Sequence, residues 1–175
     1  MQEYYRDTWA EIDLDAITHN VKQIKDLHPT KEIFAVVKAN GYGHGDAEVS
    51  KVAIEAGVSC LAVSGLDEAL RLRQSGIEVP ILVLGMTRLK DVALAAENNI
   101  SLTAHDEVWI NHLVSLPLEK KIKVHLKIDS GMHRLGLMDA NQIQTNFNLL
   151  KTAPMVEVEG IFTHMATADC DKEYL

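Results

Sequence analysis

The sequence predicts an α/β fold whose strands form a parallel sheet. Short apolar runs typical of buried strands alternate with stretches in which apolar residues recur at helical spacing. Strands and helices that take turns in this way imply right-handed crossovers between parallel strands. Polar residues also gather where several of the runs end. The six apolar runs are residues 33–37, 60–63, 81–84, 100–104, 122–128 and 156–162.

Each run can be placed between helices in chain order. A first helix is expected to begin after Asp15, because aspartate caps helix N-termini and an apolar face recurs from Ile17 onward. The run 33–37 is continuously apolar, which predicts a strand buried on both faces. Later helices have the same spacing. Their apolar faces are Val49, Val52, Ala53 and Ala56, ended by Gly57, and further on Ile143, Phe147 and Leu150.

Four polar residues favour a closed barrel over a doubly wound sheet. Lys38, Asp129 and His164 fall at the carboxyl ends of predicted strands, and Arg134 lies in the loop after one of them. A (β/α)8 TIM-type barrel gathers such residues on its catalytic face, whereas a doubly wound sheet spreads them along a row. A complete barrel has eight strand-helix units in about 250 residues. We therefore expect these 175 residues to hold only about the first six units, with no second domain.

Composition and charge exclude several kinds of partner. The net charge of −8 and the pI near 5.4 come without a basic stripe, which argues against nucleic acid. No apolar stretch is long enough to predict a membrane span or a signal peptide. Cys60 and Cys170 lie in unlike surroundings, which argues against a disulfide, and the histidines lack metal-ligand spacing. We expect a cytoplasmic protein without a metal site.

The segment 34–45, FAVVKANGYGHG, is the most informative part of the chain. Lys38 stands where the apolar strand gives way to three glycines spaced by two, which permit a tight turn with positive φ. A lysine at this position loses hydration, and the resulting partly neutral amine is suited to forming a Schiff base. The glycine spacing differs from G-x-G-x-x-G, and the lysine precedes the glycines, so neither a dinucleotide site nor a Walker A loop fits.

Three motifs together resemble the alanine racemase family, whose members use pyridoxal phosphate to interconvert L- and D-alanine. AVVKANGYGHG at 35–45 is similar to the family's cofactor-lysine motif. KIDSGMHRLG at 127–136 and GIFTHMATAD at 160–169 are similar to its lysine-to-arginine segment and to its strand ending in histidine. The opening WAEIDLDAITHNV, residues 9–21, agrees as well. The resemblance therefore covers nearly the whole chain.

The resemblance implies a role for several residues. Lys38 would carry pyridoxal 5′-phosphate and, once substrate displaces it, act as the base on the D face of the α-carbon. Tyr42 would help hold the phosphate, Arg134 would contact the cofactor's phenolic oxygen and the substrate carboxylate, and His164 would line the cofactor ring. Taken singly, these are residue types that also occur as a solvent-exposed lysine, a loop aromatic, a surface arginine and a core histidine.

Lys127 has two interpretations. The matching lysine in many family members is carbamylated by carbon dioxide, and the anion so formed would orient Arg134. Without carbamylation, two like charges would meet in a desolvated site. Alternatively, Lys127 is an ordinary cation paired with an acid, for which Asp129 on the same strand is the candidate.

The family resemblance also implies parts that lie outside these residues. Residues 1–175 would be the N-terminal portion of the barrel, whereas the remaining strands and a C-terminal β domain would be absent. The second base, a tyrosine, would come from the partner subunit of a homodimer. The D-alanine formed would supply peptidoglycan. Two alternatives remain: a serine racemase domain of glycopeptide resistance, and a single-domain pyridoxal-phosphate homeostasis protein, whose family lacks the GYGHG loop and MHRLG.

Overall fold

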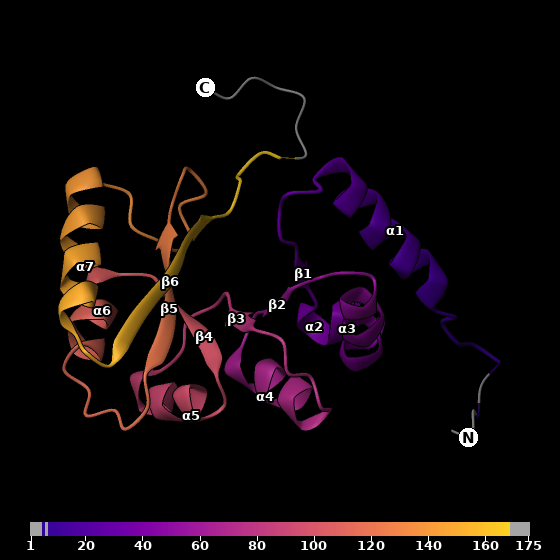
Figure 1. Cartoon of the computed structure of the whole chain (residues 1–175), viewed down its shortest axis with the longest axis horizontal. Coiled ribbons are helices and arrows are strands. Elements are labelled where there is room, and N and C mark those ends of the chain that lie inside the picture. Colours follow the sequence, from indigo (N-terminus) through magenta and orange to yellow (C-terminus); the bar gives the residue numbers. More distant parts are fainter. Residues whose placement is uncertain (1–4, 6, 169–175) are drawn as a thin grey trace.

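The structure is a computed structural model that describes residues 5 and 7–168, so Cys170 lies outside the described part. Within these residues, a six-stranded parallel sheet has its strands in the order in which they follow along the chain (Figure 1). Every predicted strand is present, with bounds that differ by at most two residues from the apolar runs. The strands are β1 (Phe34–Val36), β2 (Cys60–Val63), β3 (Ile81–Val83), β4 (Ile100–Ala104), β5 (Ile122–Ile128) and β6 (Val156–Thr163).

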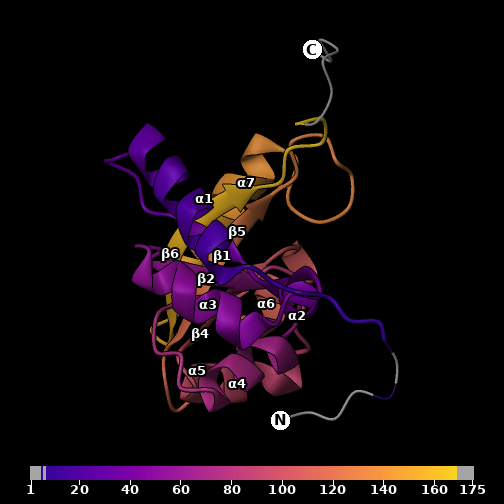
Figure 2. The same ribbon diagram turned by 90° about the vertical axis from the view of Figure 1, so that its right-hand side faces the viewer.

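Helices connect consecutive strands and pack around the outside of the sheet, as the two perpendicular views show (Figure 1, Figure 2). Helix α1 precedes β1 and contacts α3. The bounds are α1 (Leu14–Leu27), α2 (Lys38–Tyr42), α3 (Asp46–Glu55), α4 (Leu66–Gln74), the 3-10 turn η1 (Leu89–Asp91), α5 (Val92–Glu97), α6 (Glu107–Leu113) and α7 (Ala140–Thr152). Within the part of the chain that the structure describes, no helix combines the length and apolarity that crossing a membrane requires.

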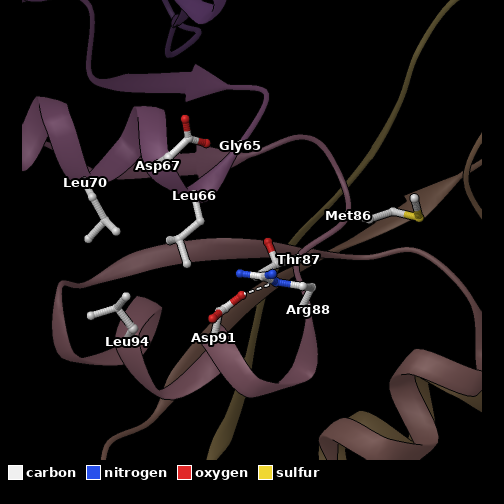
Figure 3. Close-up of a pocket in the computed structure, with 9 residues that line it drawn as sticks. All are labelled: Gly65, Leu66, Asp67, Leu70, Met86, Thr87, Arg88, Asp91 and Leu94. Atoms are coloured by element: carbon white, nitrogen blue, oxygen red, sulfur yellow. Dashed lines mark hydrogen bonds and ion pairs between the residues drawn. The ribbon is translucent and has the colours of Figure 1, made fainter.

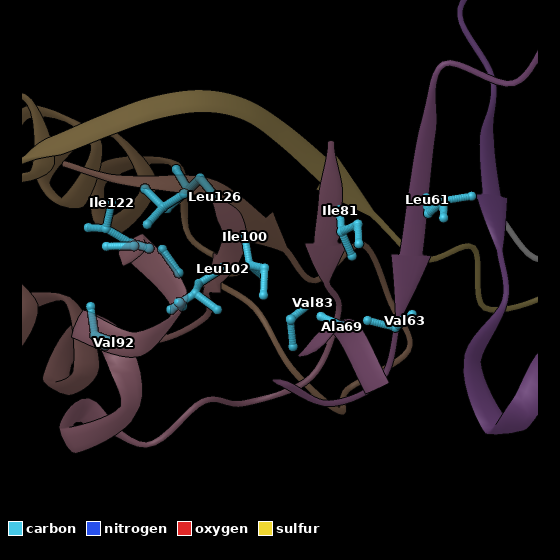
Figure 4. Close-up of a cluster of buried hydrophobic side chains, with 14 of the residues drawn as sticks. Leu61, Val63, Ala69, Ile81, Val83, Val92, Ile100, Leu102, Ile122 and Leu126 are labelled. Atoms are coloured by element: carbon cyan, nitrogen blue, oxygen red, sulfur yellow. The ribbon is translucent and has the colours of Figure 1, made fainter. Parts of the chain in front are cut away.

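The hydrophobic core lies between the sheet and these helices. Residues paired in register on parallel strands point to the same face of the sheet, and the register aligns Leu61 with Ile81 and Ile81 with Ile100. All three side chains are buried, together with Ala69 of α4 and Val92 of α5 (Figure 4). Burial of this layer of aliphatic side chains supplies the main drive for folding.

The other face of the sheet is the inside of a curved wall. The rings of Phe34 on β1 and His125 on β5 meet edge to face with centroids 6.1 Å apart. Four inter-strand spacings of about 4.8 Å would separate these strands by about 19 Å in a flat sheet, so the sheet must curl strongly. The curl and the sequential strand order confirm the barrel over the doubly wound sheet, whose strand order is not sequential.

Two details predicted from the sequence are wrong. Phe34 and Val36 are 42% and 40% exposed, so β1 is not buried on both faces. Within the described residues the strand pairs only with β2, and its inner-face side chains therefore point toward the open side of the curled sheet. Helix α1 is capped by Asp13, whose carboxylate accepts from the Ala16 N–H at 3.0 Å, and Asp15 falls in the first turn instead.

Candidate active site

Lys38 is the first residue of a left-handed turn that follows β1. Ala39, Asn40 and Gly41 have φ between 53° and 59° and ψ between 39° and 49°, which is the left-handed helical region. Tyr42 continues the turn at φ 56°, and Gly43 ends it at φ 88°. The positive φ predicted for the glycines is confirmed at Gly41, Gly43 and Gly45. Three non-glycine residues share this conformation, which costs free energy and requires support from the surrounding structure.

Hydrogen bonds to neighbouring elements support the turn. The Gly41 N–H donates to the Val37 carbonyl at 2.9 Å, which ties the turn to the end of β1. The Asn40 side chain accepts from the Asp46 N–H at the start of α3, with a distance of 3.2 Å. The Ala39 N–H donates to Glu68 of α4 at 2.7 Å. The backbone beside Lys38 is therefore fixed by contacts to three elements.

The side chains of Lys38 and Tyr42 extend from this turn on the same side. The Lys38 ammonium lies 6.0 Å from the centre of the Tyr42 ring. Lys38 is half-buried, whereas Tyr42 is 59% exposed. An amine and a phenol at the carboxyl end of a barrel strand are thus accessible to the same small molecule.

Arg134 lies on a loop that returns to the strand from which it leaves. The Asp129 N–H donates to the Leu137 carbonyl, and the Leu137 N–H donates to the Lys127 carbonyl, both at 2.9 Å. These two bonds close the neck of the loop 129–137 at the end of β5. Gly136, with φ 124°, is needed there, because an added Cβ would lie 2.6 Å from the Asp129 nitrogen.

Asp129 organises the same loop from within. Its carboxylate accepts from the backbone N–H groups of Gly131 and His133, each at 3.0 Å. These bonds hold the pKa of Asp129 below its ordinary value, the His133 N–H contributing most. Asp129 forms no ion pair with Lys127 among the residues described, so the interpretation of Lys127 as a lysine paired with this acid finds no support in the structure.

Lys127 is buried on the inner face of β5, with only 5% of its surface exposed. Its ammonium lies 4.2 Å from the centre of the Phe162 ring. Burial lowers the pKa of Lys127, and the positive charge of Arg134 lowers it further, while Asp129 acts in the opposite direction. The structure therefore favours the neutral amine more than water does.

Arg134, Lys127 and His164 line one small cavity at the carboxyl ends of β5 and β6. His164 follows the last residue of β6, and the Ser130 and Thr163 hydroxyls, 2.6 Å apart, join the loop 129–137 to that strand end. The structure thus brings together three of the predicted site residues. Lys38 and Tyr42 form a second group on the turn after β1, and no contact joins the two groups within the described residues.

A larger cavity of about 310 Å³ lies beside the carboxyl ends of β2 and β3, between α4 and η1 (Figure 3). Arg88 and Asp91 in its wall form an ion pair at 2.6 Å, and the Thr87 hydroxyl has no hydrogen-bond partner among residues 5 and 7–168. Leu66, Leu70 and Leu94 supply its apolar side. None of the predicted site residues lines this cavity, so its size alone does not mark the site.

The contacts of Glu68 and the requirement for glycine at position 136 were not predicted from the sequence. A glutamate three residues after the residue that caps a helix is a recognisable capping signal, which could have indicated a contact to the Ser64 and Gly65 amides but not the bond to Ala39. Among the described residues, no group of three or more His, Cys, Asp or Glu side chains could hold a metal ion.

Comparison with known proteins places the chain among enzymes of one family. Residues 12–175 match the family model described as alanine racemase, N-terminal domain. The alanine racemase of Geobacillus kaustophilus is 52% identical over 171 residues, which cover 97% of this chain and 44% of that protein. Alanine racemase 1 of Bacillus subtilis is 47% identical, over 95% of this chain and 43% of that protein. The chain thus spans less than half the length of these relatives.

Solved structures agree with the sequence matches. Alanine racemase from Bacillus anthracis with bound L-Ala-P superposes with a TM-score of 0.91 and 46% identity, covering 98% of this chain and 45% of that one. Histidine racemase from Leuconostoc mesenteroides gives a TM-score of 0.86 with 34% identity, covering 90% of this chain and 43% of that one. The curled six-stranded sheet is therefore the same fold as the corresponding part of these proteins.

Proposed function

Since the chain belongs to the alanine racemase family, we propose that the protein carrying it interconverts L-alanine and D-alanine with pyridoxal 5′-phosphate as cofactor. The observation that carries the proposal is the placement of Lys38. Its amine stands on a fixed turn at the carboxyl end of β1, and the cavity formed by Lys127, Arg134 and His164 lies at the carboxyl ends of β5 and β6. These strand ends share the edge of a barrel at which catalytic residues gather.

The residues present fit this cofactor. Pyridoxal phosphate offers an aldehyde, a phosphate and a phenolic oxygen, and the site offers an amine at Lys38, a phenol at Tyr42 and a guanidinium at Arg134. His164 adds a flat imidazole beside Arg134. When bound, the cofactor would supply the electron sink for the charge that develops at the substrate α-carbon.

Two residues would act on the substrate directly. The Lys38 amine would remove or return the proton at the α-carbon on the D face, as general base and acid. Arg134 would bind the substrate carboxylate, a task that suits a planar, permanently charged guanidinium. The closed loop 129–137 holds the Arg134 backbone in one place, which reduces the cost of orienting the substrate.

Lys127 would orient Arg134 as a carbamate. Carbon dioxide would bond to the neutral Lys127 amine, which loses one proton and becomes an anionic carbamate. The lowered pKa of Lys127 supports this step because a larger fraction of the amine is neutral and able to react. The anion would replace the repulsion between Lys127 and Arg134 with attraction, in a site where burial makes both effects strong.

The remaining parts of the machinery are proposed to lie outside residues 1–175. Removal and return of a proton on opposite faces need two bases, and we expect the second, a tyrosine, from the C-terminal β domain of a partner subunit in a homodimer. The isolated 175 residues should therefore not racemise alanine even with added pyridoxal phosphate. Equal activity in the isolated piece and the full-length protein would contradict this division of roles.

We propose alanine as the substrate because the two relatives described above are alanine racemases. A solved structure with the same fold in this region is named a histidine racemase, so the fold by itself does not fix the substrate. Serine therefore remains a second candidate, and rates with L-alanine and L-serine would separate the two. We propose that the protein acts in the cytoplasm and supplies D-alanine for peptidoglycan. The high identity to racemases disfavours a cofactor-homeostasis role.

Trapping the cofactor tests the proposal. Borohydride reduction of the full-length protein with pyridoxal phosphate, followed by peptide mapping, should place the adduct on Lys38. Lys38→Ala should lose both the adduct and racemase activity, because it removes the anchor and one base. Lys51→Ala, at an exposed position on α3, should keep both. An adduct on any other lysine would refute the assignment.

A further inference from the structure

Glu68 connects the turn that carries Lys38 to the neighbouring strand end. One carboxylate oxygen accepts from the Ala39 N–H at 2.7 Å. The other accepts from the Ser64 N–H at 2.6 Å and from the Gly65 N–H at 3.1 Å, where the chain leaves β2 and enters α4. A single side chain thus holds three backbone donors at the carboxyl ends of β1 and β2. Hydrogen bonds to a carboxylate are stronger than those between neutral groups.

The contact falls at the position where the turn most needs outside support. Asparagine tolerates the left-handed region because its side chain can bond locally, and Asn40 does so with Asp46. Ala39 has φ 53° and only a methyl group, which offers no compensating bond. Its N–H, directly after Lys38, is held by Glu68 alone among the described residues. Backbone in such a conformation persists only when its surroundings fix it.

We propose that Glu68 is a positioning residue for Lys38. By holding the amide between Lys38 and Ala39, it fixes the direction in which the Lys38 side chain leaves the turn and keeps the amine in line with its reaction partner. The inference rests on the proposed function, because Lys38 is the residue that would carry the cofactor. Glu68 lies outside the three motifs, and the proposed role of Lys38 in carrying the cofactor would depend on it.

Glu68→Gln tests this role with almost no change in shape. A carboxamide has one acceptor oxygen and one NH2 group. The oxygen can accept either from the Ala39 N–H or from the Ser64 and Gly65 N–H groups. The NH2 group then points at the remaining backbone N–H, and two donors face each other without a hydrogen bond. Asp67→Asn is the matched control. It makes the same chemical change one residue earlier on α4, where the Asp67 side chain is 78% exposed and pairs with Arg71 on the surface.

The first measurement needs no cofactor. Hydrogen exchange at the Ala39 amide of the full-length protein should accelerate about tenfold or more in Glu68→Gln, the expected effect of losing a charged hydrogen bond. Exchange at the buried β2 amides Leu61 and Val63 should stay as in Asp67→Asn. Equal acceleration across β2 would mean that Glu68 stabilises the fold generally, and the positioning role would be wrong.

The second measurement follows the bound cofactor. With pyridoxal phosphate at full occupancy, Glu68→Gln should show weaker visible circular dichroism, because the chromophore is held less rigidly. Its kcat should fall about tenfold while KM stays near the control value. Glu68→Met, which removes both acceptors, should show larger changes in the same direction. If Glu68→Gln matched Asp67→Asn in exchange, dichroism and kcat, the proposal would be overturned.

Failure of the two proposals can be told apart. If the wild-type protein formed no adduct at Lys38, the proposed function would fall whatever Glu68 does. If the adduct formed and Glu68→Gln behaved as Asp67→Asn does, only the positioning role would fall.

Discussion

Replacing Gly136 with alanine should open the loop that carries Arg134, whereas the same replacement at Gly131 should leave the loop closed. The two glycines lie in one loop and have nearly the same φ, 124° and 126°. They differ in their surroundings. A Cβ at position 136 would lie 2.6 Å from the Asp129 nitrogen and 2.7 Å from the Ile128 carbonyl carbon, whereas a Cβ at position 131 would meet nothing within 4 Å.

The difference between the variants isolates the overlap from the backbone strain. An alanine at either position costs about 1–3 kcal/mol because of its φ. At position 136, the overlap with backbone atoms adds about 1–3 kcal/mol, the usual cost of an extra methyl group in a packed site. The cheapest relief is to break the neck bonds of Asp129 and Leu137. The opening equilibrium in Gly136→Ala should therefore exceed that in Gly131→Ala by about 5- to 150-fold.

Hydrogen exchange at the Asp129 and Leu137 amides measures this opening, because both amides donate across the neck of the loop. Exchange should accelerate by that factor in Gly136→Ala relative to Gly131→Ala. Racemase activity of the full-length protein should fall in parallel, because Arg134 loses its fixed position. The reasoning is refuted if the two variants exchange at the same rate, or if the Gly136→Ala amides exchange as slowly as those of the wild type.

Three further predictions concern Lys127, Arg134 and Asp129, which line the small cavity at the carboxyl ends of β5 and β6. Lys127→Ala should lose most activity, and small carboxylates should restore part of it if Lys127 acts as a carbamate. Intact-peptide mass should show the added carboxylate, and full activity in the variant without rescue would contradict the role. Arg134→Lys should lower kcat/KM about 100-fold because an ammonium lacks the planar fork, whereas Arg71→Lys on the surface of α4 should not. The lowered pKa of Asp129 means that its support of the loop is complete above the unfolded value of 3.8 and is lost as the pH falls through the folded pKa. Peptic cleavage within 129–137 should rise over that acidic range in the wild type, while Asp129→Ala, which has no side-chain acceptor, should be cleaved at every pH in it.

The sequence alone was enough to predict where the strands lie and which polar residues follow them. Apolar runs such as 100–104 and 122–128 coincide with β4 and β5 residue for residue. Both strands are buried along all or most of their length, so local pattern and tertiary packing agree there. The sequence also predicted that Lys38 and His164 stand at strand ends and Arg134 in the loop after a strand, and the structure has them there. Their roles stay predictions.

Tertiary structure decided what depends on contacts between distant segments. The exposure of Phe34 follows from the place of β1 at one edge of a curled sheet, which no local pattern records. The left-handed turn after Lys38 includes Ala39, a residue that avoids positive φ by itself and adopts it with support from Glu68, 29 residues later. Gly136 is required because the loop returns to within van der Waals contact of β5. In each case the exposure or the conformation of a residue depends on atoms that are distant in the sequence. Local sequence patterns reflect only the preferences of a residue and its near neighbours, so they could not predict these features.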